Sequence, residues 1–234
     1  MIREAIVLAG GMGTRLRSVV ADVPKPMAPV NGRPFLAYVL DALQSQGITT
    51  VVLAVGYKRE VIEEYFGEEY RGMKIRYSVE EEALGTGGGI KQACGLLDGE
   101  DALVLNGDTF FGADIQALHR FYQEMDADLV LALREMRDFD RYGTVQTDTD
   151  GRVMGFEEKA YKSVGLINGG IYLFRRNLLG GEAFPQKFSF EKDVLESLFA
   201  ENRFFGLAFD VYFIDIGIPE DYERSQHELA ARTY

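Results

Sequence analysis

Hydrophobic positions in the first half of the chain follow two alternating spacings. Continuous apolar runs such as EAIVLA and TTVVLAV are typical of strands that are covered on both faces. Segments such as PFLAYVLDALQSQG place apolar residues three and four positions apart, which is the spacing of one helix face. The pattern predicts strands over 4–9, 49–55, 74–79 and 101–108, and helices over 34–47, 59–66 and 87–97.

The order strand, helix, strand predicts right-handed crossovers and a parallel sheet with helices on both faces. The second half is less regular. It predicts two strands around a DTDG turn within 142–159, further strands over 165–174 and 211–217, and helices over 190–202 and 219–234. No linker or repeat interrupts the chain. We therefore expect a single domain over 1–234, a Rossmann-like three-layer α/β/α fold with a mixed, mostly parallel sheet.

Composition and charge narrow the classes of function. The chain has 234 residues, 47% of them hydrophobic, which is enough for one sizeable core. The net charge of −12 disfavours a nucleic-acid binder, yet a few cations in a cleft could still attract a small anionic substrate. Cys94 is the only cysteine, which fits a reducing compartment. The sequence shows no leader segment and no membrane span, so we expect a cytoplasmic protein without membrane contact.

The stretch IVLAGGMGTRLRSVVADVPKPMAPV follows the first predicted strand with a glycine-rich turn. Glycines there let backbone N–H groups approach an anion, and Arg15 adds a planar fork for phosphate oxygens. Lys25, held between two prolines, supplies a second positive charge. The loop has neither the Walker A ending nor the third glycine of a dinucleotide fingerprint. It indicates a phosphate site of another type, or else a tight connection with surface cations.

LAGGMGTRL followed by PKPM resembles the signature of the sugar-1-phosphate nucleotidyltransferases. The similarity continues in the family's order through LGTGGGI, LNGDTFF, RYGTV, FEEK, NGGIYLF and FIDIGIPEDY. The resemblance implies a nucleotidyltransferase fold of the GT-A-like type. It also implies a reaction in which a sugar-1-phosphate oxygen attacks the α-phosphorus of an NTP and pyrophosphate leaves. Many members append a β-helix domain after this core, and we expect none here.

The resemblance also assigns roles to particular residues. Arg15, Lys25 and Asp108 would be catalytic, and Asp108 and Asp215 would bind Mg²⁺, which takes one or two carboxylates together with substrate phosphates. Spacing alone leaves open that Asp108 is a turn residue. The nucleotide would contact Leu8, Gly10, Gly11, Gly13, Thr14, Arg15, Glu80, Gly85, Thr86 and Asp108. The sugar phosphate would contact Tyr142, Gly143, Glu158, Lys159, Asn168 and Gly170, although Tyr142 could instead serve packing and Glu158 an exposed strand end.

The acidic run EEE bears on the choice of base. A carboxylate only accepts hydrogen bonds, and guanine offers N1–H and N2–H₂ donors side by side, so Glu80 favours GTP. One or two of Glu80, Glu81 and Glu82 would remain in solvent. The segments VPKPMAPVNGRPFL and AVGYKREVIEEYFG resemble family members that use a heptose 1-phosphate for bacterial surface polysaccharides. Mannose 1-phosphate with GTP and N-acetylmuramate 1-phosphate with UTP are the alternatives.

Two other classes of protein are weaker interpretations. A metal-dependent glycosyltransferase that consumes an NDP-sugar usually shows a D-x-D pair, and this chain shows NGD. A non-catalytic sensor should lack one of Arg15, Lys25, Asp108 and Asp215, and all four are present. We therefore expect only small molecules as substrate partners, no nucleic acid and no membrane. A homodimer is left open.

Several residues with reactive or aromatic side chains are expected to have no catalytic role. His119 and His227 lie in predicted helices rich in charge, which places them in solvent. Cys94 has the spacing of a core position within its predicted helix. The aromatic run RFFGLAFDVYF is expected to form the interior of two strands that pair with each other in antiparallel fashion.

Overall fold

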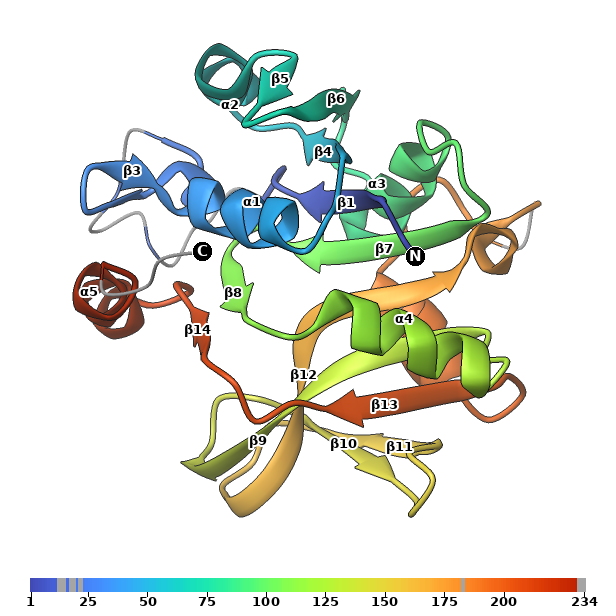
Figure 1. Ribbon diagram of the computed structural model, residues 1–234. Coiled ribbons are helices and arrows are strands. Elements are labelled where there is room, and N and C mark those ends of the chain that lie inside the picture. Colours follow the sequence, from blue (N-terminus) through green and yellow to red (C-terminus); the bar gives the residue numbers. More distant parts are fainter. Residues whose placement is uncertain (12–15, 17–19, 21–22, 182–183, 231–234) are drawn as a thin grey trace.

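The computed structural model describes residues 1–11, 16, 20, 23–181 and 184–230. A mixed sheet forms its centre (Figure 1). In order across the sheet, the strands are β11 (Val153–Glu157), β10 (Thr144–Thr147), β12 (Lys162–Arg175), β7 (Asp101–Asn106), β1 (Glu4–Leu8), β4 (Thr50–Val55), β6 (Met73–Val79) and β5 (Glu69–Tyr70). In addition, β9 (Leu129–Phe139) pairs with β12, and β13 (Phe204–Ala208) pairs with β9.

Helices cover both faces of the sheet, and Figure 1 shows α1 and α4 on the near face with α3 behind. The helices are α1 (Phe35–Ser45), α2 (Arg59–Phe66), α3 (Gly85–Cys94), α4 (Ile115–Glu124) and α5 (Pro219–Glu228), with short turns η2 (Lys25–Met27) and η3 (Arg176–Leu179) and a π-helix η4 (Phe190–Glu196). Ala5 and Val7 of β1 pack in the core under α1 and α4, whereas Ile6 packs in the core under α3. This alternation produces the predicted three layers.

The centre of the sheet is parallel, as its continuous apolar strands predicted. β1 pairs in parallel with β4 and β7, so that Leu8 lies opposite both Ala54 and Asn106. The carboxyl ends of these strands therefore meet at one edge of the sheet, where ligands bind in open α/β folds. Antiparallel strands flank this centre, which confirms the predicted mixed α/β sheet.

Two small sheets lie beside the main one and complete this edge. β8 (Thr109–Phe111) pairs in antiparallel fashion with β14 (Phe213–Asp215), and Asp215 lies opposite Thr109. β2 (Pro29–Val30) and β3 (Arg33–Pro34) form a hairpin directly after η2. Residues from the start, middle and end of the chain are thus brought to the place where β1 and β7 end.

The aromatic run near the C-terminus corrects one prediction. Its two strands do not pair with each other: β13 is parallel to β9, and β14 pairs with β8. The expected antiparallel pair was wrong because the chain leaves the main sheet after β13, and each strand meets a partner far away in sequence. The helix predicted over 190–202 is shorter in the structure, where η4 ends at Glu196. A turn follows it, in which Asn202 Nδ2 donates to the Leu198 carbonyl (3.0 Å).

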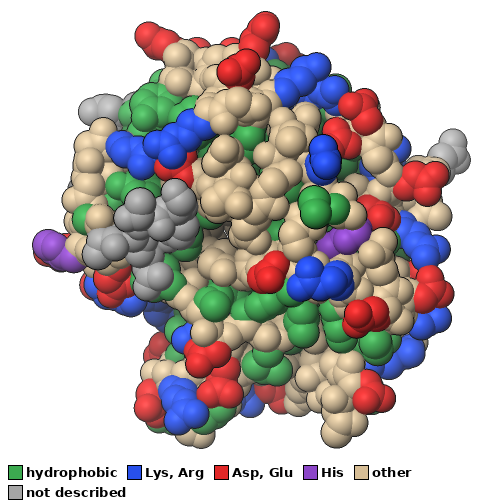
Figure 2. Space-filling model, viewed as in Figure 1, with side chains coloured by type: hydrophobic (Ala, Val, Ile, Leu, Met, Phe, Trp, Pro, Cys, Tyr) green, Lys and Arg blue, Asp and Glu red, His purple; other side chains and the backbone are tan. Residues whose placement is uncertain are grey.

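A second prediction, that His119 lies in solvent, was also wrong. His119 is only 7% exposed, because α4 packs this side of its surface against the sheet, and burial lowers the pKa of the imidazole. His227 is exposed and Cys94 is buried, as predicted. No helix in the described ranges is long and apolar enough to cross a membrane. Acidic and basic side chains are interspersed on the face in Figure 2, whose described residues show no continuous basic surface.

Candidate active site

Lys25 lies between two carboxylates at the edge where β1 and β7 end. Its Nζ is 2.6 Å from Asp108 Oδ2 and 3.3 Å from Asp215 Oδ1. Pro24 and Pro26 fix the flanking backbone in η2, and the lysine side chain is only 10% exposed. Three charged groups that are distant in sequence therefore meet at one point, as the roles implied by the family resemblance require.

Local hydrogen bonds hold the two aspartates in place. Asp108 follows β7, and its carbonyl accepts from the N–H of Ile216 (3.1 Å) in the segment after β14. The Gly217 N–H donates to Asp215 Oδ1 at 2.7 Å. Burial raises the pKa of the Asp215 carboxyl, Lys25 lowers it and Asp108 raises it, and the net change is upward. Two carboxylates and one ammonium leave this cluster with an excess of negative charge, which favours a further cation.

A cavity of about 320 Å³ opens beside this cluster. It is lined by Leu8, Gly11, Leu16, Lys25, Pro26, Thr86, Asn106, Asp108, Glu191 and Gly217. Five of these were predicted as site residues: Leu8, Gly11, Lys25, Thr86 and Asp108. Asn106 and Gly217 lie two positions from the predicted aspartates, so the NGD and DIG motifs could have revealed them. Glu191 has no such signal, because it lies in the first turn of the π-helix η4 and is distant in sequence from every recognised motif. Only the fold brings it to the cavity.

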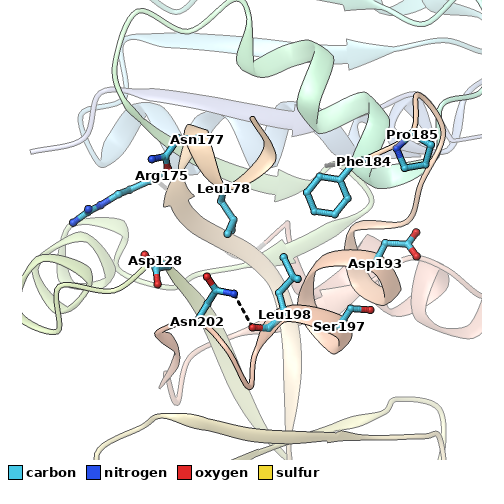
Figure 3. A pocket seen from close by; sticks show the side chains of 10 residues that line it. All are labelled: Asp128, Arg175, Asn177, Leu178, Phe184, Pro185, Asp193, Ser197, Leu198 and Asn202. Atoms are coloured by element: carbon cyan, nitrogen blue, oxygen red, sulfur yellow. Dashed lines mark hydrogen bonds between the residues drawn. The ribbon is translucent and has the colours of Figure 1, made fainter. Parts of the chain in front are cut away.

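A larger cavity, of about 660 Å³, lies elsewhere (Figure 3). It is lined by Arg175 at the end of β12, by Leu178 of η3, and by Asp193 of η4, among others. In the sheet register, Arg175 lies opposite Asp101, the first residue of β7. This cavity is therefore at the amino end of the parallel strands, whereas Asn106 is at their carboxyl end. None of the predicted site residues lines this cavity, so we place the active site in the smaller one.

Glu80 is turned inward beside the glycine loop. Its Oε2 accepts from the Leu84 N–H at 3.1 Å, and burial raises the pKa of its carboxyl. A Cβ on Gly10 would lie only 3.2 Å from Glu80 Oε1, so the two segments are in close contact. Glu81 and Glu82 are exposed. Of the three acidic residues, the structure therefore selects Glu80 as the one next to the loop that was predicted to bind the nucleotide.

The GTGGG segment packs against the chain just before η4. Gly85 has φ +73°, and a Cβ there would lie 2.5 Å from the Phe188 carbonyl oxygen. Phe188 N–H donates to the Leu84 carbonyl at 3.0 Å, and Thr86 Oγ1 donates to Glu191 Oε2 at 2.6 Å. Gly85 is therefore required for this packing, whatever it contributes to base binding.

The predicted sugar-phosphate residues fall into two groups. Tyr142 and Asp215 line a further cavity of about 230 Å³, and burial together with that carboxylate raises the pKa of the Tyr142 hydroxyl to about 12. Asn168 Nδ2 donates to the Tyr172 hydroxyl (2.9 Å), and its Oδ1 accepts from the Gly170 N–H (2.9 Å). A Cβ on Gly170 would lie 2.6 Å from Asn106 Nδ2, which places this pair next to the cavity.

The remaining predicted residues are not joined to the cavity. Glu158 and Lys159 are exposed between β11 and β12, and no described contact connects them to it. Gly143 packs closely on the start of this loop, because a Cβ there would lie 2.6 Å from the Glu157 carbonyl oxygen. Gly13, Thr14 and Arg15 lie outside the described residues.

Replacing Gly217 by alanine should disturb the aspartate cluster without unfolding the protein. A Cβ at this position would lie 2.9 Å from Asp215 Oδ1 and 3.3 Å from Lys25 Nζ, so the carboxylate must move. We expect turnover to fall by about 10- to 100-fold, because small misplacements of reacting groups are costly. Steady-state kinetics together with a thermal melt tests this. Gly32→Ala, in the open β2–β3 turn, is the control, because it can change stability but lies outside the aspartate cluster. Unchanged turnover in Gly217→Ala would contradict the close approach.

Comparison with known proteins agrees with this geometry. Residues 4–232 match the family model described as nucleotidyl transferase, so the chain belongs to the nucleotidyl transferase family. This confirms the resemblance to nucleotidyltransferases and defines the protein as an enzyme of that class.

More particular relatives share almost the whole chain. The D-glycero-alpha-D-manno-heptose 1-phosphate guanylyltransferase of Aneurinibacillus thermoaerophilus is 50% identical over 97% of this chain and 98% of its own length. The protein of the same name from Campylobacter jejuni is 51% identical over 94% of this chain and 96% of its own. The crystal structure of HddC from Yersinia pseudotuberculosis complexed with GMP-PN has 36% identity and a TM-score of 0.87, covering 97% of this chain and 100% of that one.

Proposed function

We propose that this enzyme joins GTP and D-glycero-α-D-manno-heptose 1-phosphate to form GDP-heptose and pyrophosphate, for bacterial surface polysaccharide synthesis. The observation that carries the proposal is the meeting of Lys25, Asp108 and Asp215 beside a cavity at the carboxyl edge of the sheet. The similarity to two heptose 1-phosphate guanylyltransferases over almost their full length supports the choice of substrates. We also propose a cytoplasmic location, with which the single cysteine, Cys94, is compatible.

In the proposed reaction an oxygen of the sugar phosphate attacks the α-phosphorus of GTP. The new P–O bond forms as the bond to pyrophosphate breaks, so the protein needs no nucleophile of its own. Two polyanions must come together, and the main barrier is their charge and alignment. Lys25 would neutralise the phosphate at the reacting centre, and Arg15 would face the leaving pyrophosphate.

Asp108 and Asp215 fit a role as ligands of Mg²⁺. Both already face one cation, the Lys25 ammonium, and their oxygens are the hard ligands that magnesium prefers. Within the described ranges, no group of three or more His, Cys, Asp or Glu side chains could hold an ion. We therefore propose that substrate phosphates complete the coordination. When bound, the ion would offset phosphate charge and fix the geometry of transfer.

The choice of base and sugar rests on Glu80 and on the Asn168 region. Glu80 can accept from both donors on guanine, and it lies beside Gly10. Tyr142, Gly143, Glu158, Lys159, Asn168 and Gly170 would surround the sugar phosphate. A mannose 1-phosphate guanylyltransferase is the second candidate, because the protein of that name from Mycobacterium tuberculosis is 39% identical over 97% of this chain.

A pyrophosphate-release assay tests the proposal. Four NTPs should be crossed with heptose 1-phosphate, mannose 1-phosphate and N-acetylmuramate 1-phosphate in the presence of Mg²⁺. We expect kcat/KM for GTP with heptose 1-phosphate to exceed every other pair by about 10-fold or more, the range that a few polar contacts supply. A maximum with mannose 1-phosphate or with UTP would contradict the assignment. Size-exclusion chromatography of the same sample distinguishes a monomer from a homodimer.

A further inference from the structure

Glu191 belongs to a second polar group in the active-site cavity, separate from the lysine–aspartate cluster. The first group is Lys25 with Asp108 and Asp215. In the second group, Glu191 Oε2 accepts from Thr86 Oγ1 at 2.6 Å and from Ser189 Oγ at 2.9 Å. Both Glu191 and Thr86 line the cavity together with Lys25 and Asp108. The cavity therefore contains one group with a cation, Lys25, and one group that has a carboxylate and no cation.

The carboxylate of Glu191 is oriented but not neutralised. Both hydroxyl groups donate to the same oxygen, Oε2, and a carboxylate can accept about four hydrogen bonds, so Oε1 keeps its acceptor capacity. No ion pair among the described side chains involves Glu191. Thr86 Oγ1 in turn accepts from the Phe190 N–H at 2.9 Å, which fixes the start of η4 against α3. The local structure thus holds a charged acceptor in a fixed direction without supplying its partner.

The charge of Glu191 restricts what can lie beside it. Phosphate oxygens are negative at neutral pH and would be repelled, so phosphates belong near Lys25. A neutral donor is required at Glu191, and the substrates offer many hydroxyl groups. The Tyr172 ring packs against the ring of Phe190, the residue before Glu191, with centroids 5.0 Å apart, and burial followed by the charge of Glu191 raises the pKa of Tyr172. Tyr172 also accepts from Asn168, a predicted sugar contact, whereas Thr86, which donates to Glu191, is a predicted nucleotide contact, so Glu191 lies between the two predicted substrate regions.

We propose that Glu191 is a specificity residue whose carboxylate accepts hydrogen bonds from hydroxyl groups of the bound substrate. A ring hydroxyl of the sugar 1-phosphate would donate to Oε1, the oxygen that Thr86 and Ser189 leave available. This role rests on the proposed function, because it requires a nucleotidyl transfer between two hydroxyl-bearing substrates. The ribose of the nucleotide carries the same chemistry, and the experiment separates the two sources.

The test is Glu191→Gln, which keeps the shape of the side chain and removes its charge. KM values are measured for the sugar phosphate and for GTP, with the substrate pair on which wild type is most active. We expect KM for the sugar phosphate to rise by about 10- to 100-fold, the usual cost of a lost charged hydrogen bond, with kcat and KM for GTP within about twofold. Glu196→Gln, at the exposed end of the same helix, is the matched control and should equal wild type.

Further arms separate the possible outcomes. If the ratio of kcat/KM for GTP to that for dGTP falls instead, the hydroxyl groups are those of the ribose, and the acceptor role stands. If every KM and the GTP/dGTP ratio stay within twofold, or if kcat alone falls, the proposal is overturned. Should Glu191→Gln melt early, Ser189→Ala removes one orienting hydroxyl and should raise the same KM by a smaller factor. If the wild-type enzyme is active only on another sugar phosphate, the heptose assignment is wrong. The Glu191→Gln comparison is then made with that sugar phosphate and still tests the acceptor role.

Discussion

Lys25→Ala should lower kcat/KM by about three orders of magnitude while the protein remains folded. Within the described structure, Lys25 is the only cation in contact with Asp108 and Asp215, and it lines the proposed substrate cavity. Removing one positioned group that stabilises developing charge typically costs 100- to 1,000-fold, about 3–4 kcal/mol. The loss should be at the upper end here, because the two carboxylates would also repel the incoming phosphates once the ammonium is gone.

The pyrophosphate-release assay measures this effect, and circular dichroism with a thermal melt checks the fold. Lys25 is only 10% exposed and its loss leaves both aspartates without their cation, so the melting temperature should fall, but the carboxylates are 38% and 22% exposed and the protein should stay folded. Lys74→Ala, an exposed position on β6, is the matched control and should keep full turnover. If Lys25→Ala were fully active, the assignment of this cavity as the active site would be wrong.

Asp215→Asn should remove the magnesium-dependent activity. The amide keeps an oxygen that can accept from the Gly217 N–H (2.7 Å in the native pair), so the backbone around the site should be preserved. One of only two carboxylates is nevertheless lost, and magnesium binds neutral amides far less well than carboxylates. We expect turnover to fall by about 1,000-fold or more, comparable with the loss of a principal charge-stabilising group.

A titration with Mg²⁺ and direct binding of Mn²⁺ distinguish a ligand from a merely structural residue. In Asp215→Asn, the divalent ion concentration for half-maximal activity should rise at least about 10-fold, and Mn²⁺ affinity in the presence of GTP should fall with it. Asp210→Asn, at a side chain that is 95% exposed, is the control. An unchanged magnesium requirement in Asp215→Asn would show that this residue does not bind the ion.

The order and type of the elements in the first half could be predicted from the sequence. Strands covered on both faces are apolar at nearly every position, and this leaves a clear local signal at residues 4–9 and 49–55. The second half gave weaker results because its strands take distant partners. β13 pairs with β9 and β14 with β8, and nothing local in RFFGLAFDVYF specifies those pairings. The burial of His119 likewise depends on which side of α4 meets the sheet.

The sequence by itself determined the chemical groups of the site, because Lys25, Asp108 and Asp215 stand in short motifs that follow strands or turns. Only the tertiary structure decided how they meet. Lys25 is 83 residues from Asp108 and 190 from Asp215. The pairing of β8 with β14 brings the two aspartates together, because Asp215 lies opposite Thr109. Tertiary packing also turned Glu80 inward and brought Glu191 to the cavity. Local patterns indicate which segments are apolar enough to enter the core, but contacts across such separations depend on the arrangement of the whole sheet.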